Sequence, residues 1–234
     1  RVLCVVLLLL VVVAHLPWVQ HRAGVALASK LEDKLGTRVV LDGLRWRLPA
    51  DIILDSLRLD ALEGLPLLAA DRLAVKMNWR PLIREGRIAI RNIRFYNPTI
   101  AVRADSAGAE PNYQFLIDAF STGKKAVLPE MQINSLIIRG AHLTYDIAAE
   151  PETPAELNPA HLDVSDLNAH LSLKMLTNDS LSMMMRQLSL KEKSGFQLDD
   201  MTFRLVANRQ GATLVGFNLK MPQSELRVDS LFAD

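Results

Sequence analysis

The feature that most constrains this chain is an alternation of apolar side chains by two that repeatedly skips to a spacing of three. In GRIAIRNIRFYNPTIAV, residues 86–102, Ile88 and Ile90 alternate, the next partner is Ile93, and Phe95 resumes the alternation. Alternation by two places side chains on one face of a strand. A spacing of three would turn every later side chain to the other face unless the strand bulges or turns a corner. The stretch therefore predicts an irregular strand that keeps one face apolar.

The same spacing recurs along nearly the whole sequence, usually around a small polar pair such as DG, DS, NS or DD, and such residues suit bulges and tight turns. The ten links are Leu41/Leu44, Leu54/Leu57, Ala70/Leu73, Ile90/Ile93, Ile133/Leu136, Val164/Leu167, Met185/Leu188, Leu198/Met201, Leu214/Phe217 and Val228/Leu231. We therefore expect a mainly β fold, a series of long strands that share one apolar and one polar face. Because buried parallel strands read as continuous apolar runs, the alternation predicts an antiparallel sheet.

The residues expected on the apolar face are mostly Leu, Ile, Val and Met. They are Leu54, Leu57, Leu59, Leu73, Val75, Ile88, Ile90, Ile93, Phe95, Ile133, Leu136, Ile138, Leu162, Val164, Leu167, Leu171, Leu173, Leu181, Met183, Met185, Leu188, Leu190, Met201, Phe203, Leu205, Leu214, Phe217, Leu219, Leu226 and Val228. Five cations are expected to point to water: Arg87, Arg91, Arg94, Lys174 and Arg204. Flexible aliphatic side chains line surfaces that accept variable apolar partners, but they also fill ordinary cores. The pattern alone fits the closed core of a β-sandwich or barrel as well as an open trough.

The start of the sequence has the composition of a membrane span. Residues 2–20 contain no Asp, Glu, Lys or Arg, and such a run nearly spans the ~30 Å hydrocarbon core of a bilayer. Arg1 and Trp18 flank it, as a basic residue and an interfacial indole do. We expect an uncleaved transmembrane helix over residues 1–18, with its N-terminus in the cytoplasm. The alternative is a signal peptide cleaved after Ala14.

Two further helices are expected. Residues 19–36 have an apolar stripe of Leu27, Leu31 and Leu35 followed by Gly36, which predicts a juxtamembrane amphipathic helix. Residues 104–124 interrupt the alternation, and helical spacing over 112–120 predicts a short helix within this insertion, covering part of a trough or an edge. Residues 37–234 would then be the N-terminal portion of a β-groove domain, in a fragment of a longer chain.

The sequence lacks the common motifs of catalysis, metal binding and nucleic-acid binding. Lys and Arg number 27 against 26 Asp and Glu, a net charge of +1, whereas a nucleic-acid surface needs a basic excess. The five histidines are scattered, Cys4 is the one cysteine, and no phosphate-binding glycine loop or nucleophile elbow occurs. Asp199 and Asp200 are adjacent, which fits a bulge or turn better than an acid–base pair. We expect no catalytic residues, no metal and no cofactor, and hence no enzyme.

Several segments carry a resemblance to a known family. They include LEDKLGTRVVLDGLRW (31–46), NYQFLIDAF (112–120) and LSLKEKSGFQLDDMTFRL (188–205), of which EKSGF (192–196) is the most distinctive piece. With them the chain resembles the N-terminal part of the TamB family, in the AsmA-like superfamily, in the form typical of Bacteroidota. VKMNW is more polar, and the loop at GLPLL shorter, than is usual there.

The resemblance implies a function in outer-membrane biogenesis. Such proteins resemble bridge-like lipid-transfer proteins: a single-pass anchor in the inner membrane, the bulk in the periplasm, and a taco-shaped β-sheet whose apolar groove carries phospholipid. The resemblance also implies an outer-membrane barrel partner of the assembly family at the distal end, as in a translocation and assembly module. The alternative is a scaffold for barrel assembly, in which the groove holds protein strands. A closed β-domain with a structural role comes third.

Overall fold

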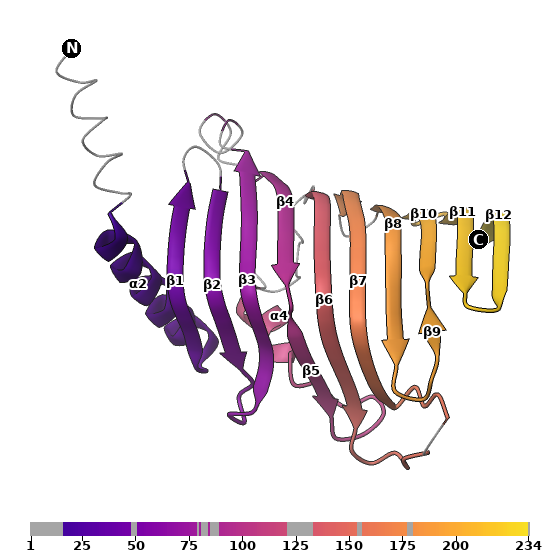
Figure 1. Cartoon of the computed structure of the whole chain (residues 1–234), viewed down its shortest axis with the longest axis horizontal. Helices are drawn as coiled ribbons and strands as arrows, with labels where there is room; N and C mark the ends of the chain where they lie inside the picture. Colours follow the sequence, from indigo (N-terminus) through magenta and orange to yellow (C-terminus); the bar gives the residue numbers. More distant parts are fainter. Residues whose placement is uncertain are drawn as a thin grey trace.

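The computed structural model describes residues 16–47, 51–78, 80, 84, 89–120, 133–153, 156–176 and 180–233. They form a mainly β structure, one twelve-stranded sheet with two assigned helices (Figure 1). The elements are α2 (Pro17–Leu35), β1 (Val39–Arg47), β2 (Asp51–Asp60), β3 (Pro66–Asn78), β4 (Ala89–Tyr96), β5 (Thr99–Ala104), α4 (Gln114–Phe120), β6 (Ile133–Ile147), β7 (His161–Leu176), β8 (Ser180–Glu192), β9 (Gln197–Leu198), β10 (Asp200–Asn208), β11 (Gly211–Met221) and β12 (Ser224–Ala233).

The sheet is mixed, and the prediction of a purely antiparallel sheet is wrong at one place. The strand order is β1-β2-β3-β4-β6-β7-β8-β10-β11-β12, with β5 beside β3 and β6 and β9 beside β8. Strand β6 runs parallel to both β4 and β5, while the other pairs are antiparallel. Parallel neighbours need a connection of a dozen or more residues. The predicted insertion is this connection, and α4 lies within it.

The predicted corners are present in the middle of the strands. At the Leu41/Leu44 and Leu54/Leu57 links, one residue of β1 and one residue of β2 are left out of the pairing, so that apolar side chains stay opposite one another. Ser56, at this corner, has a φ of 52°, and Asp166 in β7 has a φ of 50°. Left-handed backbone is uncommon outside glycine and is better tolerated by small polar residues than by branched ones. The small polar pairs in the sequence therefore mark real backbone irregularities.

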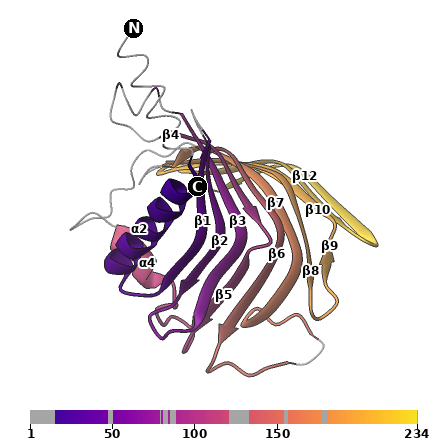
Figure 2. The ribbon, with the colours of Figure 1, turned by 60° about the vertical axis from the view of Figure 1, so that its left-hand side comes forward.

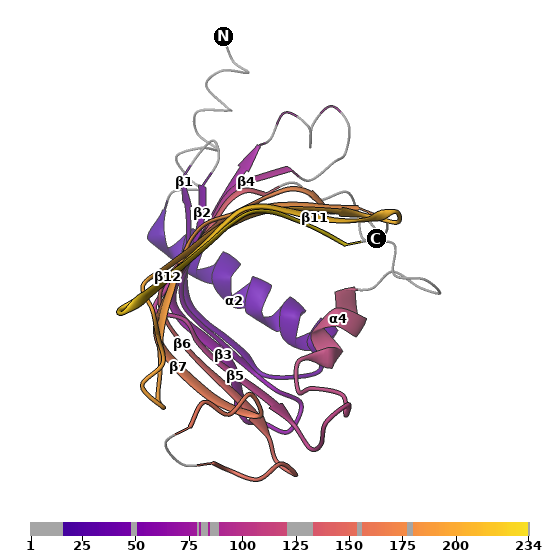
Figure 3. The ribbon, with the colours of Figure 1, turned by 90° about the vertical axis from the view of Figure 1, so that its right-hand side faces the viewer.

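Other links are β-bulges in one strand. Lys76 of β3 pairs with Asn92 and Met77 pairs with Ile90, so Arg91 is an extra residue in β4. Strand β8 has a similar bulge at Arg186 opposite β7. Bulges bend the strand that carries them. Figures 2 and 3 show the result, a sheet curled into a trough with α2 and α4 on its concave side.

The C-terminal end of helix α2 lies where the sequence predicts it. It ends at Leu35, and Gly36 takes a φ of 68° and donates its backbone N–H to the carbonyl of Glu32 at 2.8 Å. Gly24 faces β1, because a Cβ built on it would lie 3.3 Å from the Cβ of Leu44. A glycine here lets the helix approach the strand closely.

The packed core of the described residues lies beneath the two helices. Leu35, Val39, Leu59, Ala61 and Leu67 are between 0% and 8% exposed. Residues of both helices pack against them: Leu31 from α2, and Phe115, Leu116 and Ala119 from α4. The predicted helix of the insertion therefore covers the concave face at the β1 end of the trough.

Candidate functional site: an apolar trough

The register joins the apolar side chains of successive strands into continuous rows across the concave face. One row is Leu44, Leu54, Leu73, Phe95, Ile138, Ala169 and Leu188; the next is Trp46, Ile52, Val75, Ile93, Leu136, Leu171, Met185 and Phe203; a third is Met77, Ile90, Ile133, Leu173, Met183, Leu205, Leu214 and Leu231. None of these residues is charged. Since neighbouring strands are about 4.8 Å apart, the ten strands of the main path give the face a length of about 45 Å.

The remaining residues expected on this face belong to shorter stretches of the same surface. The pairs are Leu57 with Leu41, Leu59 with Val39, Leu162 with Tyr145, Val164 with Leu143, Leu167 with Ala141, Leu181 with Ala207, Leu190 with Leu198, Met201 with Leu219, Phe217 with Val228, and Leu226 with Leu219. Ile88 and Arg87 lie outside the described residues. Arg94 and Arg204 pair with Ala74 and Met184, on the other face, and both are exposed.

The two ends of this surface differ in exposure. Leu59 is 7% exposed beneath the helices, whereas Leu226 and Leu231 on β12 are 50% and 53% exposed. Most of the row residues between are half-buried. In the described part of the chain, β1 and β12 do not pair with each other, and α2 and α4 are the elements seen against the concave face (Figure 3). The described residues therefore form an open trough with one covered end, and the closed core that the pattern also allowed is not observed.

The sequence reasoning missed several residues of the rows. Trp46, Ile52 and Met77 lie in them, and Ile100 pairs with Leu143 in the same face. Trp46 and Ile52 lie two residues from Leu44 and Leu54, and Met77 lies two residues beyond Val75, so continuing the alternation one step further along each strand finds these three.

Ion pairs on the convex face hold the corner between β1, β2 and β3. The Arg45 guanidinium donates to both carboxylate oxygens of Asp55, at 2.6 and 2.7 Å, and Arg72 Nε donates to the same carboxylate at 3.2 Å. Hydrogen bonding from Arg45 lowers the pKa of Asp55, with a smaller contribution from Arg72, although partial burial opposes it. One carboxylate thus links three strands next to the left-handed Ser56.

The distinctive EKSGF segment forms the tight turn between β8 and β9. Glu192 is 8% exposed, and its carboxylate accepts hydrogen bonds from the backbone N–H and the hydroxyl of Ser194 and from the backbone N–H of Asp163. Burial alone would raise the pKa of Glu192, but these hydrogen bonds outweigh it and hold the pKa below its usual value. Gly195 has a φ of 98°, which favours glycine. The segment is therefore a structural turn at the rim of the trough.

The histidines near this rim pair with carboxylates. His161 lies 2.6 Å from Asp146 and 2.9 Å from the carbonyl of Glu150, and these contacts, the carbonyl first, raise the pKa of His161. His142 lies 2.7 Å from Asp163. A hollow of about 640 Å³, lined mostly by polar and charged residues, opens beside His161. Among the described residues, no three His, Cys, Asp or Glu side chains are arranged to hold a metal ion.

The predicted membrane segment lies almost wholly outside the described residues. Residues 1–15, with Arg1, are not described, and Trp18 sits in the first turn of α2, 58% exposed, with the Arg22 guanidinium 5.6 Å from its ring centroid. Of the helices in the described part, none is long and apolar enough to cross a bilayer.

No protein-family model, curated protein or solved structure matches this chain. Its function is therefore inferred from the two faces of the sheet.

Proposed function

We propose that this chain is part of a lipid conduit, in which the trough carries the acyl chains of phospholipids between the inner and outer membranes. The observation that carries the proposal is the uncharged apolar face that runs from β1 to β12 and that the described residues leave uncovered over most of its length. Exposing an acyl chain of about fifteen methylenes to water costs on the order of 12 kcal/mol. A path between membranes must therefore be apolar throughout, and it requires no catalytic group.

The geometry favours lipid over a protein strand as the occupant. A strand gains affinity by adding to the edge of a sheet, where backbone N–H and C=O groups pair. The face of the trough offers apolar side chains, and a strand lying across it would leave its own backbone groups unpaired against an apolar surface, at a cost in free energy. An acyl chain has no such groups. The scaffold for barrel assembly remains the second candidate because the edge of β12 is open in the described part of the chain.

The resemblance to the TamB family extends this proposal to the location and the partner of the chain. Residues 1–18 would anchor the chain by a single pass in the inner membrane, with the trough in the periplasm and an outer-membrane barrel of the assembly family as the distal partner of a longer chain. N-terminal sequencing of the mature protein tests the anchor. A mature chain that starts after Ala14 would contradict it.

Charges placed in the rows test the conduit. Met185→Glu and Ile138→Asp should remove most of the phospholipid that co-purifies with the chain, because a buried charge imposes a desolvation cost of several kcal/mol on a neighbouring acyl chain. Lys174→Glu and Arg91→Glu, at exposed positions, are the matched controls and should leave it unchanged. Protease resistance and membrane fractionation first establish that each variant folds and is retained. Folded row variants that keep their full lipid content would refute the conduit.

A further inference from the structure

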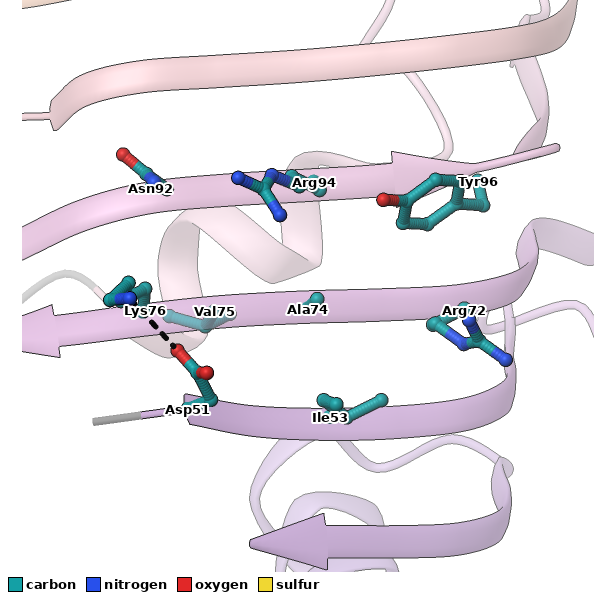
Figure 4. Close-up of a pocket in the computed structure, with 9 residues that line it drawn as sticks. All are labelled: Asp51, Ile53, Arg72, Ala74, Val75, Lys76, Asn92, Arg94 and Tyr96. Carbon is teal, nitrogen blue, oxygen red and sulfur yellow. Dashed lines mark ion pairs between the residues drawn. The ribbon is translucent and has the colours of Figure 1, made fainter. Parts of the chain in front are cut away.

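The convex face carries a shallow pocket of about 190 Å³ across β2, β3 and β4 (Figure 4). Ala74 lies at its centre, paired with Ile53 on one side and with Arg94 on the other. Arg72 and Lys76 lie two residues away from Ala74 along β3, so they project from the same face. Three cations thus surround a small side chain that leaves the space between them empty.

The charges of the pocket are incompletely neutralised. Arg72 pairs with Asp55 at 3.2 Å and stacks on Tyr96, with its guanidinium 6.0 Å from the ring centroid. Lys76 Nζ is 3.9 Å from Asp51, which is the one carboxylate that lines the pocket. Like charges on neighbouring strands destabilise a sheet. An anion between these cations would remove that repulsion.

Arg94 stands out because its side chain has no ion-pair or hydrogen-bond partner among the described residues, although it lines the pocket. Its diagonal neighbours across the strand pair are Arg72 and Lys76, and such positions lie about 7–8 Å apart, within reach of long side chains. Asn92 and Tyr96, on either side of Arg94 along β4, add an amide and a hydroxyl donor.

We propose that this pocket binds a phosphate group, supplied either by a phospholipid headgroup or by free phosphate. Arginine presents a planar fork of N–H donors that fits phosphate oxygens in a bidentate manner, and lysine adds a compact charge. Cations that approach from two strands suit a tetrahedral, multiply charged group. The site lies on the face opposite the trough and is independent of the lipid conduit.

Side-chain NMR of the arginine Nε–H groups in the full chain tests this. Inorganic phosphate and the tail-free diester glycerophosphoglycerol are titrated separately, against chloride at the same ionic strength. We expect a saturable shift of the Arg94 signal. Arg94→Gln should weaken binding, followed on the remaining pocket signals, about tenfold, the loss of one charge-assisted hydrogen-bond pair. Ala74→Leu should abolish binding without changing any charge, and Lys174→Gln is the control that should bind normally.

Saturation by the diester assigns the site to a lipid headgroup, and saturation by inorganic phosphate alone assigns it to free phosphate. Shifts equal to those in chloride would overturn the proposal, as would binding that persists in both Arg94→Gln and Ala74→Leu. Neither result bears on the lipid content of the trough.

Discussion

The two ends of the trough are built from the same alternation but are covered differently. At the β1 end, Leu59 and Ala61 are 7% and 0% exposed because α2 and α4 lie over them. Toward β12, Leu226 and Leu231 belong to the same apolar face and are about half exposed. Alternation therefore determines which face of a strand is apolar, whereas the presence of a covering element elsewhere in the chain determines whether that face is a core or a surface.

Truncating a side chain at each end should show this difference most strongly. Leu59→Ala should lower the free energy of unfolding by about 2–5 kcal/mol, because it opens a cavity under the helices. Leu214→Ala, in the part that the described residues leave uncovered, should cost about 1 kcal/mol, because a partly exposed leucine gains less from burial. Denaturant unfolding of both variants measures the comparison. Equal losses would mean that the far end is covered as well.

A smaller effect is expected from the ion pairs on the convex face. The pKa of Asp55 is lower in the folded chain than its unfolded value of about 3.9. Its stabilisation is therefore complete above that value and is lost as the pH falls through the folded pKa. Asp55→Asn should lower the free energy of unfolding by up to about 1 kcal/mol at pH 7. The free energy of unfolding of this variant should also fall less than that of the parent as the pH is lowered.

The matched control for Asp55 lies at the uncovered end. Glu225→Gln breaks the pair with Arg227, 2.6 Å away, which joins two residues of one strand and holds no strands together. Glu225→Gln should leave the unfolding curve unchanged both at pH 7 and in acid. A loss as large as that of Asp55→Asn would show that bridging three strands adds nothing.

Much of the sheet was predictable because each link is visible locally in the sequence, as two apolar residues three apart within an alternating run. The pairing of Met185 with Phe203, or of Leu54 with Leu73, follows once the phase is kept across every skip. The parallel pairing of β6 was not predictable, because it depends on the path of the connection rather than on periodicity. A helix over 112–120 was expected to cover part of the trough or an edge, but its position over Leu59 was not predictable, because Phe115 and Leu116 come from a part of the chain far from Leu59 in sequence.

The pocket on the convex face left no periodic signal either. Arg72, Lys76 and Arg94 come from two strands that the register brings together, and along the sequence each reads as an ordinary exposed cation. The small Ala74 between them can be recognised as the centre of a pocket only when its neighbours across the sheet are known.

The central claim, that the uncovered apolar face carries lipid, is tested most directly by photo-cross-linking in native membranes. A photoreactive residue is placed at Ile138 or Met185 in the uncovered rows, at Leu59 beneath the helices, and at Lys174, an exposed cation expected on the outer face. The account predicts phospholipid adducts at Ile138 and Met185 and none at Leu59 or Lys174. Protein adducts at Ile138 and Met185, or phospholipid adducts spread equally over all four positions, would contradict it.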